Sequence, residues 1–385
     1  MTMRAALLMS CGLLAATPAF AGIHDILIGL DEKVTYDGNG ALNGGPGRDS
    51  VVVMDVSNPA KPKIRAALPL MNSLLGPPTN LQITADGKVG LVANSVVMNQ
   101  DGGAWKPAPD NKLFVIDLNA TPPVLSDTVT VGLQPSGLAI SHKGDLALTA
   151  NRAGKSVSVL SIQNGVVKSL GDVAMEQEAA AVAITPDGKR AFVCLNLVNK
   201  IGVLKIEGQT VTYDKTMDIP AGFNPYNIDI TPDGKYAFAS NTGAQKNNAD
   251  AVVVIEATGP HPHVIDIMTP GIGPEGFAIS PNGKWAISPL LLGTTAKAGD
   301  WFKTKGGELV VMSVGAGGKL KVTGRAALGV IPEAIAYSPN SEYVYVGNYS
   351  GRDLQVFRLW NGKPVQVGPN LKLPGQPASM RGVAR

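Results

Sequence analysis

The sequence is poor in cysteine and in charge, and each shortage excludes a class of protein. Only two of its 385 residues are cysteines, Cys11 and Cys194, so a small scaffold held together by several disulfides is excluded. Charged residues make up 16% of the chain and the net charge is only +3. Because the lysines and arginines are scattered and form no basic stripe, we expect no nucleic-acid partner.

Several catalytic and cofactor motifs are missing from the sequence as well. It has no Gly-rich phosphate loop ending in Lys-Ser/Thr, no Gly-x-Ser-x-Gly nucleophile elbow and no Cys-x-x-Cys-His haem attachment motif. A resident cofactor is therefore not implied. A redox role would need a separate partner protein.

The first 21 residues have the pattern of an export signal. Arg4 supplies a positive start, residues 5–16 an apolar run, and Ala19-Phe20-Ala21 a cleavage site of small residues. The run is too short to span a bilayer, so we expect no transmembrane segment. Cleavage after Ala21 would send a mature chain, 22–385, to the periplasm or outside the cell. A lipoprotein cleavage before Cys11 is the alternative.

Glycine and proline are abundant, at 45 and 28 residues, and they recur at turn positions. The sequence ITPDGKYAFASN at 230–241 reads as a strand end, a tight turn and a second strand, because Pro presets φ and Gly tolerates a positive φ. Related copies are anchored at Thr84, Ser141, Thr185, Thr231, Ser280 and Ser338, in steps of 44 to 58 residues. A period of this size made of strands and turns predicts a radial array of small sheets.

Each repeat contains four candidate strands, so the number of first strands in the whole sequence gives the number of blades. Seven first strands follow Pro78, Pro135, Ala179, Pro225, Pro274, Pro332 and Pro377. The last has no partners after it, whereas the mature N-terminus supplies candidate second, third and fourth strands at 26–36, 50–56 and 63–70. We therefore predict one all-β domain over 22–385. It is a seven-bladed β-propeller of four-stranded antiparallel blades, closed by N- and C-terminal strands that share one blade. We expect a monomer.

The second strands, above all YVYVGN at 343–348, resemble the Tyr-Val-Thr-Asn (YVTN) propeller repeat with its preceding Ser-Pro-Asp-Gly turn. The resemblance covers nearly all of the mature chain and implies a lactonase-like propeller fold. Similar propellers occur in lactone hydrolases, muconate-cyclising enzymes, heavy chains of amine dehydrogenases and domains of redox enzymes. No Trp-Asp dipeptide is present, which argues against the WD40 class.

The extra length of the chain falls in loops that open on one face of such a ring. These loops are 37–49, 95–111, 242–250 and 290–307. Two of them carry a tryptophan, Trp105 and Trp301, among polar residues. Because loops on a rigid scaffold usually carry binding residues, we expect a binding face here. Tolerated surface insertions are the alternative.

Charged and aromatic residues are expected where the channel opens on the same face. Glu275 and Glu333 follow their prolines at equivalent places, Tyr226 holds that place in the preceding blade, and Arg152 follows the second strand of another. Glu275, Glu333 and Arg152 are the catalytic candidates, since a carboxylate can activate water on a lactone while a guanidinium stabilises the oxyanion. Mutual pairing without catalysis is the alternative. Arg381 lies on the strand that follows Pro377, the last of the seven first strands, and completes the expected ligand contacts.

One metal site would arise only from cleavage after Ala21. The mature chain would then begin Gly22-Ile23-His24, and its amine, two amide nitrogens and imidazole form a square-planar set that suits Cu(II) or Ni(II). An accidental histidine near the terminus is the alternative.

Three functions follow from these observations. The first is an exported propeller that binds a small molecule or a periplasmic protein at its loop-rich face. The second is a lactonase- or cyclase-like enzyme acting on a lactone or organic acid. The third is a scaffold that docks a redox or envelope protein. The sequence leaves open whether the protein is an enzyme.

Overall fold

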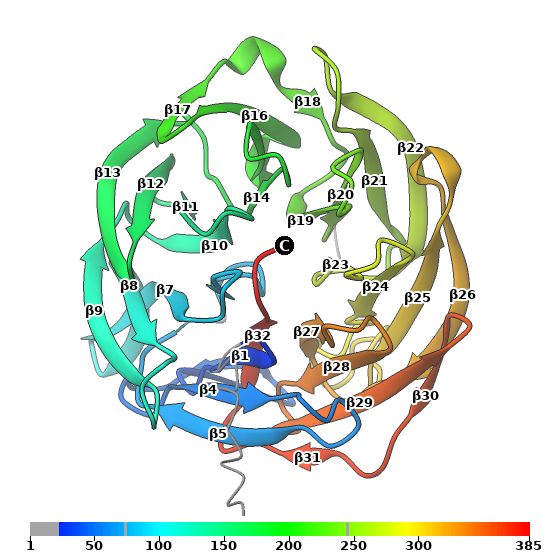
Figure 1. The fold of residues 1–385 in the computed structure, drawn as a ribbon. Helices are drawn as coiled ribbons and strands as arrows, with labels where there is room; N and C mark the ends of the chain where they lie inside the picture. Colours follow the sequence, from blue (N-terminus) through cyan, green and yellow to red (C-terminus); the bar gives the residue numbers. More distant parts are fainter. Residues whose placement is uncertain (1–22, 73–74, 244–245) are drawn as a thin grey trace, which may run out of the picture.

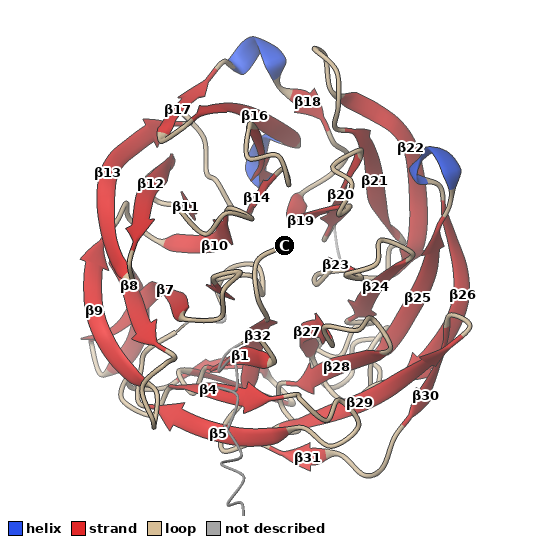
Figure 2. Ribbon diagram, in the orientation of Figure 1, coloured by secondary structure: helices blue, strands red, loops and turns tan. Residues whose placement is uncertain are grey.

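The computed structural model describes residues 23–72, 75–243 and 246–385, so the expected leader lies outside the described residues. The chain forms a ring of seven antiparallel blades around a central axis (Figure 1). Strands dominate, and the only helical elements of the described chain are three short 3-10 turns, η1 (Asn196–Val198), η2 (Lys215–Met217) and η3 (Ala316–Gly318) (Figure 2). None of the described helical segments has the length or apolarity needed to cross a membrane.

The blades confirm the predicted seven-bladed propeller. From the axis outward, blade 1 consists of β32 (Pro377–Arg381), β1 (Asp25–Leu30), β4 (Ser50–Asp55) and β5 (Lys63–Leu68). Blade 2 consists of β6 (Leu81–Ile83), β7 (Val89–Asp101), β8 (Ala104–Asp117) and β9 (Val124–Thr130). Blade 3 consists of β10 (Pro135–Ile140), β11 (Leu146–Asn151), β12 (Ser156–Gln163) and β13 (Val166–Ala174). Blade 4 consists of β14 (Val182–Ile184), β15 (Arg190–Leu195), β16 (Lys200–Glu207) and β17 (Thr210–Tyr213), with β18 (Ile219–Pro220) beside β16. Blade 5 consists of β19 (Pro225–Ile230), β20 (Tyr236–Asn241), β21 (Asp250–Glu256) and β22 (His263–Gly271). Blade 6 consists of β23 (Ala278–Ile279), β24 (Trp285–Leu290), β25 (Glu308–Val314) and β26 (Leu320–Ala327). Blade 7 consists of β27 (Pro332–Tyr337), β28 (Tyr343–Asn348), β29 (Asp353–Trp360) and β30 (Lys363–Gln366), with β31 (Leu371–Lys372) beside β29.

Blade 1 closes the ring from both ends of the chain, as the sequence predicts. The C-terminal strand β32 pairs antiparallel with β1, with Leu27 opposite Arg381, and β1 pairs in turn with β4. This pairing gives β1 a hydrogen-bonded neighbour on both sides, so the two ends of the chain complete one four-stranded blade.

The repeated turns owe their shape to local hydrogen bonds. The Thr231 hydroxyl donates to the Asp233 carboxylate at 2.6 Å and accepts from the Tyr236 amide at 3.1 Å. Gly234 has φ = +71° and donates its amide to the Thr231 carbonyl, a conformation in which glycine carries no steric cost. The same side-chain contact recurs in Thr84–Asp86, Thr185–Asp187, Ser280–Asn282 and Ser338–Asn340.

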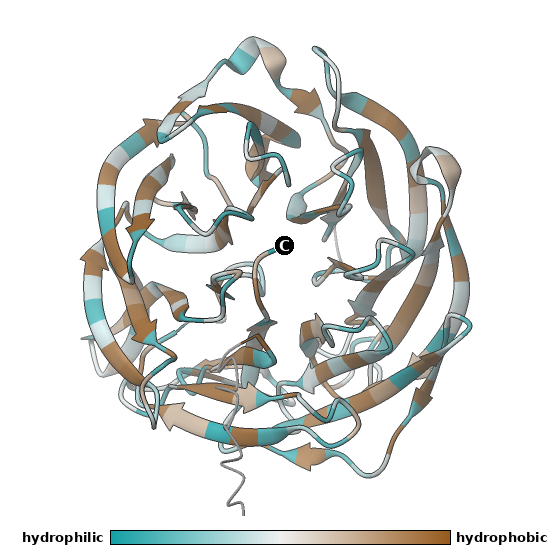
Figure 3. Cartoon of the chain, in the orientation of Figure 1, coloured by the Kyte–Doolittle hydropathy of each residue, from teal (hydrophilic) through white to brown (hydrophobic). Residues whose placement is uncertain are grey.

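The hydrophobic core lies between the blades. Phe192 of blade 4, for example, is fully buried in one cluster with Ile228 and Val253 of blade 5. The outermost strands face the core on one side only, so hydrophobic and hydrophilic residues alternate along them (Figure 3). This packing fixes the blades against one another and gives the loops a rigid support.

The expected strand at 26–36 is wrong in its second half. Strand β1 ends at Leu30, and the chain then forms a separate hairpin, β2 (Val34–Asp37) with β3 (Gly40–Asn43). The break has a physical cause, because Lys33 is fully buried and its ammonium is bonded by groups outside the sheet. The expected loop 37–49 therefore contains half of this hairpin.

The expected loop 95–111 is also wrong, because most of it is strand. Strands β7 and β8 continue past the blade as a long hairpin and turn at Gly102 and Gly103, which have φ of +56° and +84°. Two consecutive residues at positive φ form the turn that suits the twist of a two-residue hairpin.

The connections between second and third strands, and from each fourth strand to the next blade, open on one face. We call it the loop-rich face; it carries the β2–β3 hairpin, the distal β7–β8 hairpin and the irregular segment 291–307. The opposite face carries the Thr-Pro-Asp-Gly turns.

Candidate functional site

The first strands run from the loop-rich face toward the opposite face, which places the residues after their prolines at the loop-rich mouth of the axis. Tyr226 follows Pro225 at the start of β19, and Glu333 follows Pro332 at the start of β27. Glu275 follows Pro274, but the expected strand 274–279 shrinks to Ala278–Ile279, because the Glu275 amide donates to the Gly273 carbonyl in a tight turn.

A close approach of two backbones brings Glu275 and Glu333 together. A Cβ at position 276 would lie 2.9 Å from the carbonyl oxygen of Glu333, so only glycine permits this contact between blades 6 and 7. The two neighbouring glutamates therefore lie side by side at the mouth.

Neither of these carboxyl groups has a hydrogen bond or ion pair within the part of the chain that the structure describes, although Glu333 is only 6% exposed. Burial raises the pKa of Glu275 to about 7, against the opposing effect of the Arg152 charge. Burial also raises the pKa of Glu333, and the charges of Glu275 and Asp31 raise it further. At neutral pH the pair therefore retains protons that exposed glutamates would have lost.

Arg152 and Tyr226 complete the polar wall. Arg152 lies just after β11 and reaches Glu178 at 3.5 Å, a long ion pair, while its Nε atom has no partner among the described residues. Burial and the Glu275 charge raise the pKa of Tyr226, so its phenol stays protonated and can donate a hydrogen bond. The wall thus combines a cation, a proton donor and a titratable carboxyl.

A pocket of about 430 Å³ opens beside this wall on the loop-rich face. Its lining consists of Arg152, Asn196, Leu197, Asn199, Phe223, Asn224, Tyr226, Thr242 and Glu275. The volume lies in the range of small-molecule sites. A larger pocket of about 770 Å³ lies on the opposite side between blades 4 and 5. Its Arg190 already donates to the carbonyls of Ala257 and Gly259, so this cationic group is satisfied within the fold.

Sequence reasoning missed Tyr36, which the β2–β3 hairpin brings to the mouth. Burial raises the pKa of its phenol, and the charges of the nearby Glu333 and Glu275 raise it further. The ring packs edge-on against Tyr349, with centroids 6.2 Å apart. The Tyr349 hydroxyl donates to the Val34 carbonyl at 2.6 Å, and this bond fixes the root of the hairpin.

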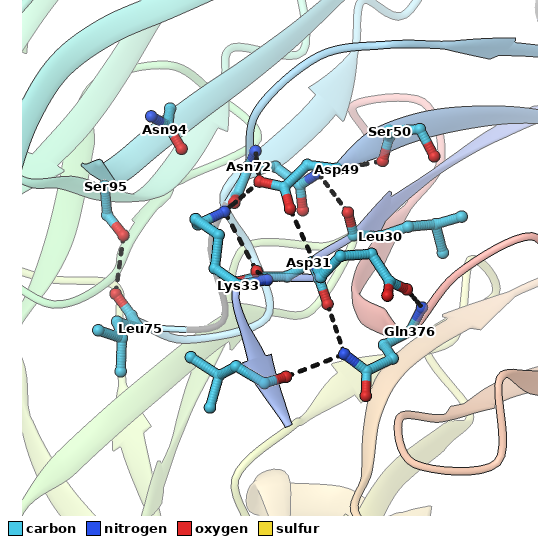
Figure 4. A network of polar contacts seen from close by, with 12 residues as sticks. Leu30, Asp31, Lys33, Asp49, Ser50, Asn72, Leu75, Asn94, Ser95 and Gln376 are labelled. Atoms are coloured by element: carbon cyan, nitrogen blue, oxygen red, sulfur yellow. Dashed lines mark hydrogen bonds and ion pairs between the residues drawn. The ribbon is translucent and has the colours of Figure 1, made fainter. Parts of the chain in front are cut away.

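A buried polar network holds the other side of that root (Figure 4). Lys33 donates to Asp49 and to the Asn72 carbonyl and lies 3.1 Å from the Asp31 carboxylate. Asn72 donates in turn to the carbonyls of Leu30 and Ser50, each at 3.0 Å. The charged run 31–33 directly after an apolar strand was the sequence signal for this network.

The pocket lining does not include four of the predicted contact residues, Trp105, Trp301, Glu333 and Arg381. Trp105 is half-buried against the Gly-rich segment, where a Cβ on Gly45 would meet its ring at 3.0 Å, and its carbonyl accepts from Asn43. Trp301 is 79% exposed and touches Phe302 edge-on. Trp105 therefore serves packing between loops, whereas Trp301 is free on the surface.

The structure also separates Arg381 from the loop-rich mouth. Arg381 ends β32, and its guanidinium donates to the Leu138 carbonyl at 2.6 Å in a cavity of about 120 Å³ that Asp229 also lines. Our placement of Arg381 with the other ligand contacts is therefore corrected, because the five residues of β32 carry it toward the opposite face.

The predicted metal ligand His24 lies at the beginning of the described chain. It is exposed, and its carbonyl accepts from the Val56 amide at 2.8 Å. Gly22, whose amine would complete the set, lies outside the described residues. Within the described ranges, no three His, Cys, Asp or Glu residues gather in a metal-binding group. Cys194 is buried, and burial raises the pKa of its thiol.

The fold is shared with solved structures of low sequence identity. A putative 6-phosphogluconolactonase from Bacteroides fragilis matches with a TM-score of 0.69 and 17% identity over 92% of this chain and 96% of its own. A periplasmic gluconolactonase from Pseudomonas aeruginosa matches at 0.64 and 18% identity, over 94% and 99% of the two chains. Hydrazine synthase from Kuenenia stuttgartiensis matches at 0.56 and 19% identity, over 75% and 78%.

These comparisons define the class of protein by its architecture. No known protein family and no curated protein sequence matches the chain. The neighbours include lactonase-like seven-bladed propellers, so the resemblance read from the sequence is confirmed at the level of the fold.

Proposed function

We propose that the protein binds a small organic molecule at the loop-rich mouth. The observation that carries this proposal is the wall of Arg152, Tyr226 and Glu275 along a 430 Å³ pocket. Burying a carboxyl without a partner costs stability, and ionisable groups with raised pKa values cluster at functional sites. Glu333 is buried and Glu275 is half-buried, and neither carboxyl has a partner among the described residues.

Lactone hydrolysis is the second candidate, and the pKa of about 7 for Glu275 favours it. Ionised Glu275 would take a proton from water while the water oxygen bonds to the lactone carbonyl carbon. Arg152 would stabilise the oxyanion. The intermediate would then break the ring C–O bond, and the protonated Glu275 would return its proton to the leaving oxygen, giving a hydroxy acid. The lactonases among the structural neighbours support this choice of substrate class. Cyclisation is the same chemistry in reverse.

Docking of a periplasmic redox or envelope protein is the third candidate. The supporting observation is Trp301, because a tryptophan that is 79% exposed on a loop is the kind of residue that anchors protein interfaces. Docking of a periplasmic protein requires export, which we propose from the leader 1–21. Mass spectrometry of the protein recovered from the periplasm tests this: a mass that begins at Met1 would contradict cleavage after Ala21.

Variants of the polar wall test the ligand site. The full mature chain and its Glu275→Gln and Arg152→Gln variants are titrated with lactones and assayed for acid release. We expect each substitution to weaken binding at least tenfold and, if the protein is a hydrolase, to lower turnover by about 100-fold or more. Glu342→Gln, an exposed glutamate on the opposite face, is the matched control. Unchanged binding and turnover in both wall variants would place the site elsewhere.

A further inference from the structure

The pocket has an apolar rim beside its polar wall. Leu197 is 65% exposed and Phe223 is 59% exposed, and both line the 430 Å³ pocket. Large apolar side chains exposed to this degree leave apolar surface in water, which is unfavourable in the free protein. Because both line one pocket, they give it an apolar rim that a ligand with an apolar group would cover.

Both side chains are held out by fixed turns. Leu197 sits in η1, which ends at Asn199 with φ = +60°. The Asn199 side-chain oxygen accepts from the Asn224 amide at 2.9 Å, and the Asn224 side chain donates to the Thr242 hydroxyl at 2.7 Å. The loop that carries Phe223 is thereby tied to two neighbouring turns. The rim is a preformed surface, and a ligand pays little entropy to use it.

The charges of the wall argue against a strongly anionic ligand. Arg152 is the one cation among the described residues that line the pocket, and it already faces Glu275 and Glu178. A phosphorylated sugar acid would bring negative charge into a pocket that has one cation, next to Glu275, whose carboxyl ionises near pH 7 and would then repel it. An uncharged ring ester avoids this repulsion and still accepts hydrogen bonds from Arg152 and Tyr226.

From these observations we infer that the ligand of the loop-rich mouth is a lactone that carries an alkyl or acyl chain. Its ring lies against Arg152, Tyr226 and Glu275, and its chain lies against Leu197 and Phe223. The inference rests on the proposed ligand site and names its substrate class. It separates this pocket from one built for polyhydroxylated sugar lactones, whose hydroxyl groups would be desolvated on the apolar rim.

Calorimetric titration of the mature protein with three probes tests the inference. The probes are γ-valerolactone with a methyl substituent, γ-octalactone with a butyl substituent, and D-glucono-δ-lactone. Each fully buried methylene tightens binding about fourfold, so three methylenes on a partly open rim should give a gain of about tenfold. We expect the butyl lactone to bind about tenfold tighter than the methyl lactone, and gluconolactone to bind more weakly than either.

Rim variants show whether Leu197 and Phe223 are the cause. In Leu197→Ser/Phe223→Ser the ratio of butyl to methyl affinity should fall to about one. Ile267→Ser removes an apolar side chain of similar exposure from the outer strand β22, away from the pocket, and should keep the tenfold ratio. Both substitutions are on the surface, so the variants should fold.

Two outcomes overturn the inference in different ways. Equal affinities for the methyl and butyl lactones, or tightest binding of gluconolactone, with Glu275→Gln still abolishing binding, would refute the apolar chain and leave the proposed site intact. No binding of any of the three lactones would refute the proposed lactone site itself, and the inference with it.

Discussion

The two ends of the central axis use buried charge in opposite ways. At the opposite face the Asp229 carboxylate accepts from the amides of Ile230 and Ile279, at 2.9 and 2.8 Å, and Arg381 donates to the Leu138 carbonyl. The bonds from Ile279 to Asp229 and from Arg381 to Leu138 link the first strands of different blades. At the loop-rich mouth the carboxyls of Glu275 and Glu333 bond to no described residue. Charge that is satisfied by neighbouring blades holds the ring, whereas charge left without a partner is available to a ligand.

Removing Arg381 should give the largest loss of stability and test the structural role of the opposite end. Arg381→Met takes away the guanidinium that donates to the Leu138 carbonyl and stabilises the Asp229 charge, and it leaves Arg385 as the remaining cation of that cavity. We expect the free energy of unfolding to fall by about 3 kcal/mol, measured by urea denaturation.

The matched control for this variant is Lys143→Met, an exposed cation on the same face, which should change stability by less than about 0.5 kcal/mol. If Arg381→Met instead abolished lactone binding and left stability unchanged, the division of roles between the two ends would be wrong.

The unpaired carboxyls of the loop-rich mouth should make the protein less stable as the pH rises. The pKa values of Glu275 and Glu333 are raised in the folded protein, so the native state holds protons that the unfolded chain releases. Their contribution is fully present below about pH 4.5 and is lost as the pH rises toward about 7. Relative to Glu275→Gln/Glu333→Gln, the wild-type protein should lose about 1–3 kcal/mol across this window.

Urea denaturation at a series of pH values measures this difference, with Glu342→Gln as the control that should keep the wild-type slope. Identical slopes for the double variant and the wild-type protein would mean that these carboxyls are not buried in the way the structure shows.

The two tryptophans of the loop-rich face should also divide into one that stabilises the fold and one that is available to a partner. Trp105 packs on the Gly-rich segment, so Trp105→Ala should cost about 1–2 kcal/mol of stability. Trp301→Ala should cost less than about 0.5 kcal/mol because the ring is exposed. If Trp301 docks a partner, its removal should release a co-purifying periplasmic protein that Trp105→Ala retains. Equal destabilisation by both variants would contradict the packing that the structure assigns.

The parts of this fold that depend on local chemistry could be predicted from the sequence. The hydrogen bonds of Thr231 and Asp233 span five residues or fewer, and the six copies of this turn in the sequence revealed the repeat, from which the count of first strands gave seven blades. The location of Glu275 and Glu333 at the loop-rich mouth could be predicted because each follows a proline at the expected start of a first strand. Position along a repeated strand is thus a guide to position along the axis.

Features that depend on distant segments were not predictable. Strand β1 ends early because Lys33 bonds to Asp49 and Asn72, 16 and 39 residues away. Tyr36 reaches the mouth because Tyr349, 315 residues beyond Val34, anchors the hairpin. The charged run 31–33 marks the network but does not identify its distant partners, so the sequence located the wall of the site and missed the residue that the hairpin adds to it.

The smallest expected effect concerns His24, which lies on the opposite face at the start of β1. A chain prepared to begin at Gly22 should bind one Cu(II), with a visible absorption band of a square-planar nitrogen site, and His24→Ala or acetylation of the Gly22 amine should remove that band. Because His24 is exposed, copper should leave lactone affinity at the loop-rich mouth unchanged. An equal band in His24→Ala would assign the metal to other ligands. A change in lactone affinity on adding copper would show that the two faces communicate and would break the separation between the two ends of the axis.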